Sequence, residues 1–284
     1  MGTRKFNATT PSRRFMSMSD FSEVTRSKPE KKLVSSKKRT GGRNNRGRMT
    51  SRHRGGGHKR RYRRIDFRRT KDDMSATVVG IEYDPNRSCH IALVKYEDGT
   101  LRYILAPKDL TADNVVVSSS EQIDPKPGNC MPIRHIPTGL MLHNIEFEPG
   151  RGGKLCRSAG VGARLTNKEG RWATIVLPSG EIRQVSLDCR ATVGSLGNSD
   201  HGNIKLGKAG RARWLGRKQT TRGVAMSHHC HPHGGGDGKS KGGQEPSNAA
   251  GTGAKGGRTR SRNKSSSSRI IRRRKSKRYG QLKV

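Results

Sequence analysis

The chain has 284 residues and carries 60 Lys and Arg against 22 Asp and Glu, a formal net charge of +38. Hydrophobic residues make up 29% and aromatic residues 4%, which is low for one globular core of this length. A free monomeric enzyme would repel itself at this charge, so the composition favours a polyanion as partner. No apolar run approaches the roughly 18 residues that cross a bilayer, and we expect no membrane partner.

The positive charge is confined to the two ends of the chain. Residues 70–195 contain 15 Lys and Arg and 15 Asp and Glu, so the rest of the chain holds the whole excess. This pattern is typical of a folded centre with arms that enter an anionic partner. We expect a basic N-terminal arm over 1–69, a first barrel over 70–125, a second barrel over 126–195, and a basic Gly-rich C-terminal arm over 196–284.

The first arm has the composition of a segment that does not fold alone. Residues 31–69 carry seventeen Lys and Arg and one acid, Asp66. The stretch GGRNNRGRMTSRHRGGGHKRRYRR has almost no apolar side chains to offset the entropy cost of ordering. We expect it to be irregular and to become ordered against a partner.

The centre reads as short strands separated by turns. The expected strands are residues 76–81, 91–96, 101–105, 115–117, 131–136, 140–147, 159–165, 173–177 and 182–187. Asp98-Gly99 between two strand-like runs is a strong hairpin signal, and Pro178-Ser-Gly-Glu181 is a further turn. Since no long helical periodicity is present, the pattern favours two small β-barrels or sandwiches, with a boundary near 124–128.

The second arm is again basic and poor in apolar residues. Residues 207–218 are Gly-rich with one aromatic, 239–257 are polar and of low complexity, and 269–278 carry seven cations. A helical turn that starts near Ser268 fits the sequence. The five cysteines, Cys89, Cys130, Cys156, Cys189 and Cys230, show no paired spacing, which argues against a disulfide framework and for a reducing compartment.

RNA fits these arms better than DNA, because no recognition helix, zinc-finger spacing or basic zipper is present. Arg and Lys neutralise phosphates, and Tyr62, Phe67, Trp172 and Trp214 are aromatics that could stack on bases. The candidate contacts in the first arm are Arg43, Arg46, Arg48, Arg52, His53, Arg54, His58, Lys59, Arg60, Arg61, Arg63, Arg64, Arg68 and Arg69. Those in the second arm are Lys208, Arg211, Arg213, Trp214, Arg217, Lys218, Arg222, His231, His233, Gly234, Gly235, Gly236, Arg272, Arg273 and Arg274.

The stretch SHHCHPHGGGDGK at residues 227–239 raises a metal, a catalytic and a binding interpretation. His228, His229, Cys230, His231 and His233 are too crowded for one closed zinc site, and no second ligand pair stands out. No nucleophile completes an acid–base constellation. The glycines favour close approach to RNA, and the Asp237 carboxylate is a candidate for sharing a hydrated Mg²⁺ with phosphates. Beyond that ion we expect no cofactor and no protein metal site.

Several long motifs resemble the family of the second protein of the large ribosomal subunit, in its bacterial form. They are GGRNNRGRMTSRHRGGGHKRRYRRIDFRR, IEYDPNRSCHIALVKYEDGTLRYILAP, HNIEFEPGRGGKLCRSAG, LPSGEIRQVSLDCRATVGSLGN, LGKAGRARWLGRK and TRGVAMSHHCHPHGGGDG. The resemblance runs from residue 1 to about 238 and resumes near 255–275.

This resemblance implies an all-β fold, an oligonucleotide-binding-fold barrel followed by an SH3-like barrel, with long irregular basic arms. It implies a structural, ribosomal-RNA-binding constituent of the large subunit that supports subunit association, tRNA binding and the peptidyl-transferase region in translation. The implied partners are large-subunit ribosomal RNA, neighbouring ribosomal proteins, small-subunit RNA at the subunit interface, and tRNA indirectly. The family histidine discussed for peptide-bond formation maps to His231, with His233 beside it; both are candidates for lying near an RNA-built reaction centre, and we expect no enzyme.

The sequence departs from the family pattern in the second arm. Ser227-His-His-Cys230 stands where Asn-Pro-Val-Asp is usual, so no acid directly precedes His231, and Pro246-Ser-Asn-Ala-Ala250 replaces a Pro-Trp-Gly segment. The opening MGTRKFNATTPSRRF looks like the ordinary bacterial start, which favours a ribosome in the bacterial cytoplasm over an organellar one. A free nucleic-acid binder and a metal-dependent enzyme centred on residues 228–233 are the competing hypotheses.

Overall fold

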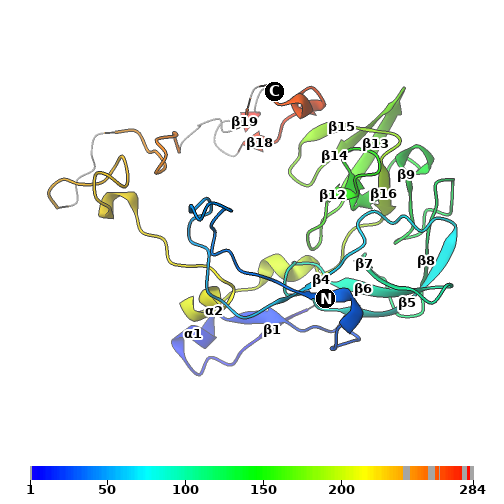
Figure 1. Cartoon of the computed structure of the whole chain (residues 1–284), viewed down its shortest axis with the longest axis horizontal. Helices are drawn as coiled ribbons and strands as arrows, with labels where there is room; N and C mark the ends of the chain where they lie inside the picture. Colours follow the sequence, from blue (N-terminus) through cyan, green and yellow to red (C-terminus); the bar gives the residue numbers. More distant parts are fainter. Residues whose placement is uncertain (1, 239–243, 255–259, 262, 277–279, 282–284) are drawn as a thin grey trace.

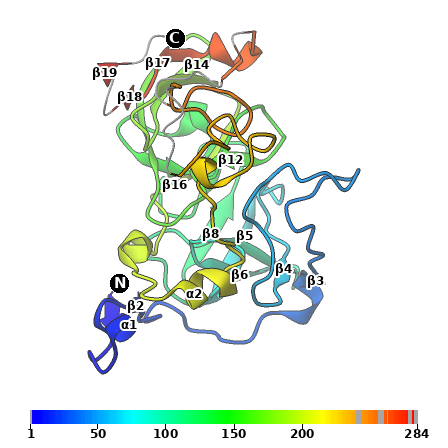
Figure 2. The same ribbon diagram turned by 90° about the vertical axis from the view of Figure 1, so that its left-hand side faces the viewer.

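The computed structural model describes residues 2–238, 244–254, 260–261, 263–276 and 280–281. Two β-rich bodies stand one above the other, and extended segments from both ends of the chain run beside them (Figures 1 and 2). Strands β5 to β7 lie in the lower body of Figure 1, and β13 to β16 lie in the upper body. In the described part of the chain, no helix is long and apolar enough to cross a membrane.

The first barrel is built from β5 (Met74–Glu82), β6 (Ile91–Tyr96), β7 (Leu101–Leu105) and β8 (Val115–Ser118). These strands are antiparallel neighbours in the order β8-β5-β6-β7. On β5, Ala76 and Val78 point into the core while Thr77 and Val79 point out, as alternating residues of a strand must. The predicted hairpin is confirmed, with Gly99 at φ +78° in the turn.

The second barrel contains β9 (Cys130–Pro132), β10 (Met141–His143), β13 (Ala163–Glu169), β14 (Trp172–Val176), β15 (Ile182–Ser186) and β16 (Arg190–Val193). Its core packs Met131, Leu142, Leu165, Ile175 and Val193. A small ribbon of β11 (Ile145–Glu146) and β12 (Gly153–Leu155) lies beside it. A single parallel contact between Ser118 and Cys130 joins β8 to β9 and so links the two barrels. The predicted all-β class is confirmed.

Three predicted strands differ most from the observed bounds. Residues 131–136 form a strand only to Pro132, and a 3-10 helix, η2 (Ile133–His135), follows. The run 140–147 is divided into β10 and β11 at Asn144, which has φ +49°. The strand expected from 159 begins at Ala163, because Gly160 has φ +65° and turns the chain first.

The C-terminal arm contributes a strand to the second barrel. After the 3-10 helix η5 (Ser265–Ser267), β17 (Ile270–Arg272) pairs antiparallel with β15, and Ile270 is buried. The helical turn expected near Ser268 therefore ends just before that residue, and a strand follows. Part of the arm that composition marks as irregular is a structural element of the second barrel.

The arms contain further short elements and are not wholly irregular. The first holds β1 (Thr3–Lys5), α1 (Pro11–Arg14), β2 (Ser17–Ser19), η1 (Lys31–Leu33), β3 (Val34–Ser36) and β4 (Arg61–Arg63). The second holds η3 (Ser199–Asn203), α2 (Ala209–Trp214), η4 (Gly223–Ala225), β18 (Lys275–Ser276) and β19 (Gly280–Gln281). In the polar stretch 239–257, positions 239–243 and 255–257 lie outside the described residues, as do Lys277 and Arg278 of the C-terminal cation run. The four-part division of the chain stays a prediction.

Candidate nucleic-acid interface

The two basic arms meet at a backbone junction around Arg54 and Arg217. Arg54 pairs with Arg217 in an antiparallel bridge, although 163 positions separate them in the sequence. The amide of Gly55 donates to the carbonyl of Gly216 at 3.1 Å, and the amide of Lys218 donates to the carbonyl of His53 at 3.0 Å. These hydrogen bonds gather the cations of both arms into one surface, which we call the arm junction (residues 53–58 with 214–218).

The last glycine of RHRGGGH, Gly57, is needed for this junction. Gly57 has φ +88°, and a Cβ placed on it would lie 2.7 Å from the backbone nitrogen of Gly216. Its neighbour Gly56 has φ +66° but nothing within 4 Å of such a Cβ. Gly57 therefore serves close approach between the arms of this chain.

Most of the candidate RNA contacts are exposed. The exposed candidates of the first arm are Arg43, Arg46, Arg48, Arg52, Arg54, His58, Lys59, Arg61, Arg64 and Arg68. Those of the second arm are Lys208, Arg213, Trp214, Arg217, Lys218, Arg222, Gly235, Gly236, Arg272 and Arg274. Half-buried candidates are His53, Arg60, Arg63, Arg211, His231, His233, Gly234 and Arg273. Mutual repulsion among these cations is relieved when phosphates neutralise them, which favours a polyanion on this surface.

A few predicted contacts have their side chains committed within the protein. Arg69 is only 2% exposed, and its Nε donates to Ser118 Oγ at 2.9 Å, so this residue is a correction to the candidate set. Arg211 donates to the Ser17 carbonyl at 3.0 Å and ties α2 to β2. Arg63 lies 3.9 Å from the buried carboxylate of Asp84. A buried guanidinium needs its partners inside the fold, which explains why these residues are less available to RNA.

The four candidate stacking aromatics differ in what already covers them. The guanidinium carbon of Arg269 lies 3.4 Å from the centre of the Trp172 ring. The Phe67 ring is contacted by Arg157 at 4.5 Å and by Arg87 at 5.6 Å. Tyr62 is exposed, and Trp214 is 58% exposed. Trp214 is thus the most accessible of the four for stacking on a base.

The HPHGGG segment forms a compact turn. The rings of His231 and His233 stack with their centres 5.3 Å apart. His231 Nδ1 accepts the amide hydrogen of His233 at 3.0 Å, and His233 Nε2 accepts that of Ser247, also at 3.0 Å. Gly234 is packed so closely that a Cβ on it would lie 2.3 Å from the carbonyl oxygen of Ser227. This turn presents the exposed Gly235, Gly236 and Asp237.

Metal ligation is not assembled within the described ranges. There, no group of three or more His, Cys, Asp or Glu side chains could hold an ion. The rings of His228 and His229 lie 3.9 Å apart, but His231 and His233 each use one nitrogen as an acceptor for a backbone amide. The histidine side chains of residues 228–233 are therefore crowded in the structure, as the sequence indicates. Asp237 is exposed.

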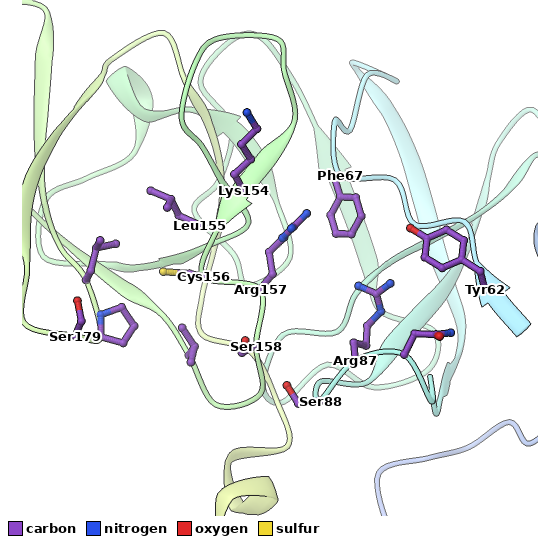
Figure 3. Close-up of a pocket in the computed structure, with 14 residues that line it drawn as sticks. Tyr62, Phe67, Arg87, Ser88, Lys154, Leu155, Cys156, Arg157, Ser158 and Ser179 are labelled. Carbon is purple, nitrogen blue, oxygen red and sulfur yellow. The ribbon is translucent and has the colours of Figure 1, made fainter. Parts of the chain in front are cut away.

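A hollow of about 770 Å³ lies between the barrels, and its cations were missed at the sequence level. Figure 3 shows Lys154 and Arg157 from the second-barrel side, with Phe67 and Arg87 from the first-barrel side. The Arg87 Nε is held 2.6 Å from Asp84 Oδ2, and Arg157 donates to the Gly153 carbonyl at 3.2 Å. Arg87, Lys154 and Arg157 lie within residues 70–195, where acidic and basic residues balance, so the net charge gave no sign of them. The stretch RGGKLCR was the available signal.

Several titratable groups are removed from solvent within the barrels. Burial raises the pKa of Cys156, which lines the same hollow, to about 11, so its thiol stays protonated and is a poor nucleophile. Burial also raises the pKa of Glu82, although the Tyr103 hydroxyl donates to it at 2.7 Å. Arg26 of the first arm lies 3.7 Å from Glu82 and anchors that arm to the barrel. These groups act within the fold.

Comparison with known proteins gives matches over most of the chain. Residues 30–118 match the family described as Ribosomal Proteins L2, RNA binding N-terminal domain. Residues 126–251 match the family described as Ribosomal Proteins L2, C-terminal domain. The chain is 53% identical over 285 residues to the large ribosomal subunit protein uL2 of Rhodopirellula baltica, covering 100% of this chain and 99% of that relative.

Proposed function

The chain belongs to the ribosomal protein L2 family, and from that premise we propose that its joined basic arms are the main surface with which it binds ribosomal RNA. As a member of this family it is a structural, RNA-binding constituent of the large ribosomal subunit and not an enzyme. Its bacterial relative assigns it to a ribosome in the cytoplasm. Its fold is an oligonucleotide-binding-fold barrel followed by an SH3-like barrel.

The observation that carries the proposal is the arm junction. Arg54 and Arg217 come from opposite ends of the chain, and backbone hydrogen bonds hold them side by side. Because the barrels are charge-neutral and the arms hold the net +38, phosphate neutralisation is concentrated where the arms lie together. The hollow around Arg87, Lys154 and Arg157 extends this cationic surface between the barrels.

The HPHGGG turn supports a finer proposal. We propose that the turn reaches toward the peptidyl-transferase region and supports tRNA binding and subunit association by shaping RNA. Its exposed glycines have no side chains that would obstruct an RNA groove, and Asp237 is the candidate for a shared hydrated Mg²⁺. Neighbouring ribosomal proteins and small-subunit RNA are the further partners in this proposal.

Charge-matched variants test the main proposal. One full-length variant carries Arg46→Gln, Arg48→Gln and Arg52→Gln in the first arm, and a control carries Lys95→Gln, Lys108→Gln and Arg171→Gln on the barrels. All six side chains are exposed, and both variants lose the same charge. Binding to large-subunit ribosomal RNA is measured over a range of salt concentrations.

We expect the arm variant to bind more weakly and its salt slope to fall by about 0.7 to 0.9 for each phosphate that is no longer neutralised. The barrel control should keep a slope close to that of the original protein. Equal losses of affinity in both variants would contradict the proposal, because they would show that total charge rather than the arms determines binding.

A further inference from the structure

A second hollow, of about 680 Å³, lies where the first barrel meets the C-terminal arm. Tyr83, at the end of β5, and Trp214, at the end of α2, both line it. Both views place α2 on the side of the first barrel (Figures 1 and 2). We call it the Tyr83–Trp214 hollow; Trp214 is among the candidate contacts from the sequence, and Tyr83 is not.

The two aromatic rings are positioned and still accessible. Phe21 packs edge-on against Tyr83 with the ring centres 5.4 Å apart, and Lys208 Nζ lies 5.0 Å from the centre of the Trp214 ring. Tyr83 nevertheless remains 47% exposed, and Trp214 58% exposed. Large aromatic surface left in water beside fixed neighbours is typical of a binding site.

Arg60 connects the two sides of the hollow. Its guanidinium donates to the carbonyl of Pro85 at 2.8 Å and to that of Leu215 at 3.3 Å. Because one planar group bridges the barrel loop and the end of α2, it fixes their spacing. Leu215, which is 45% exposed, adds apolar surface beside Trp214.

Cations surround this apolar surface. Lys59 and Arg61 line the same hollow and are exposed, and Arg63 lines it beside Asp84. An apolar peptide side chain would fit the aromatic surface but would leave these charges unmatched. A nucleotide satisfies both features, since its base has an apolar face and its phosphate is anionic.

We propose that the Tyr83–Trp214 hollow binds one unstacked base of the ribosomal RNA, with the adjoining phosphates on Lys59 and Arg61. This inference rests on the proposed function and adds a specific subsite to it. Trp214 and Tyr83 supply stacking surfaces, which accept any base. Arg60 is a positioning residue, because it holds the two sides of the hollow through backbone carbonyls.

Binding of full-length variants to large-subunit ribosomal RNA, at several salt concentrations, tests this proposal. Trp214→Ala and Tyr83→Ala remove the stacking surfaces, Trp214→Phe retains an aromatic ring, and Val115→Ala is a control at another exposed apolar residue, 55% exposed on β8. Arg61→Gln removes a proposed phosphate contact. Ultraviolet crosslinking of the unmodified protein to the same RNA, followed by mass spectrometry, identifies residues that lie against bases.

We expect Trp214→Ala to weaken binding about tenfold with an unchanged salt slope, and Trp214→Phe to restore most of the affinity. Tyr83→Ala should weaken binding in the same way, Val115→Ala should not, and Arg61→Gln should lower the slope. A peptide containing Tyr83 or Trp214 should carry a crosslinked nucleotide.

Two results would overturn the inference while leaving the proposed function intact. One is original-strength RNA binding by both alanine variants together with no crosslink at either aromatic. The other is normal RNA binding by these variants with loss of a neighbouring protein from reconstituted particles, which would assign the hollow to a protein partner. If the unmodified protein failed to bind ribosomal RNA, the proposed function and this inference would fall together.

Discussion

Gly57 lies so close to Gly216 that a Cβ on Gly57 would stand 2.7 Å from the Gly216 backbone nitrogen. The atoms it would meet are backbone, so the two segments would have to separate at this junction to make room. This contact joins segments that sequence analysis treats as separate arms, and it makes the RNA-binding surface depend on their docking.

The docking can be tested with neighbouring glycines. Gly57→Ala should open the arm junction, while Gly56→Ala has a similar positive φ but open space for its Cβ. Each substitution should lower the folding stability by about 1 to 2 kcal/mol, because alanine is strained in the left-handed conformation. Only Gly57→Ala adds a backbone clash. We expect faster tryptic cleavage within residues 52–61 and weaker RNA binding for Gly57→Ala. Identical behaviour of the two variants would show that the junction does not matter.

The C-terminal strand should contribute to the stability of the second barrel. Ile270 is 6% exposed and its neighbour Ile271 is 52% exposed, although both lie on β17. Ile270→Ala should cost about 2 to 4 kcal/mol of unfolding free energy, because it removes buried methyl groups and leaves a cavity. Ile271→Ala should cost less than about 0.5 kcal/mol. Thermal or denaturant unfolding of the RNA-free protein measures both; equal small effects would show that β17 is not part of the stable fold.

Stability should fall on mild acidification because of His143. Burial lowers the pKa of this imidazole from 6.5 to about 4, and nearby Arg69 acts in the same direction, while the bond from Nδ1 to the Gly194 carbonyl opposes them. The neutral form is favoured in the fold, so its contribution is complete above pH 6.5 and is lost as pH falls from 6.5 toward 4. The slope from this group approaches about 1.4 kcal/mol per pH unit.

His143→Gln should flatten that part of the stability profile even where it lowers overall stability. His135→Gln, on η2, is the control and should leave the slope unchanged. Denaturant unfolding at a series of pH values measures the slope of the unfolding free energy against pH. A profile of the His143→Gln variant parallel to that of the original protein would assign the acid sensitivity to other groups, among them His90, whose pKa burial also lowers.

The position of the His231 ring should matter for translation. A Cβ on Gly223 would lie 2.4 Å from the His231 ring, so Gly223→Ala should displace that ring. We expect Gly223→Ala and His231→Ala both to leave RNA binding nearly intact and to slow translation or subunit joining. Gly202→Ala, which meets nothing within 4 Å, is the control. Normal translation and joining in both variants would contradict a role near the reaction centre.

Local signals predicted the barrels well. The strands at 91–96 and 101–105 were confirmed residue for residue, because apolar runs and the Asp98-Gly99 turn act over short distances. The strand β17 was not predictable in this way, since its partner β15 lies more than 80 positions away. The same holds for Arg54 beside Arg217, and for Phe67 between Arg87 and Arg157. The distribution of Lys and Arg predicted the two arms, but it carries no information on the contact that joins them.

As a member of the L2 family, this chain should be an integral RNA-binding component of the large subunit. Sedimentation of the tagged full-length protein from gently lysed cells, in low and high salt, tests it most directly. We predict co-migration with large subunits and joined ribosomes that persists in high salt, because an integral component is held by more than the phosphate contacts that salt weakens. Release of the protein into the light fractions, with ribosomes intact, would contradict this account.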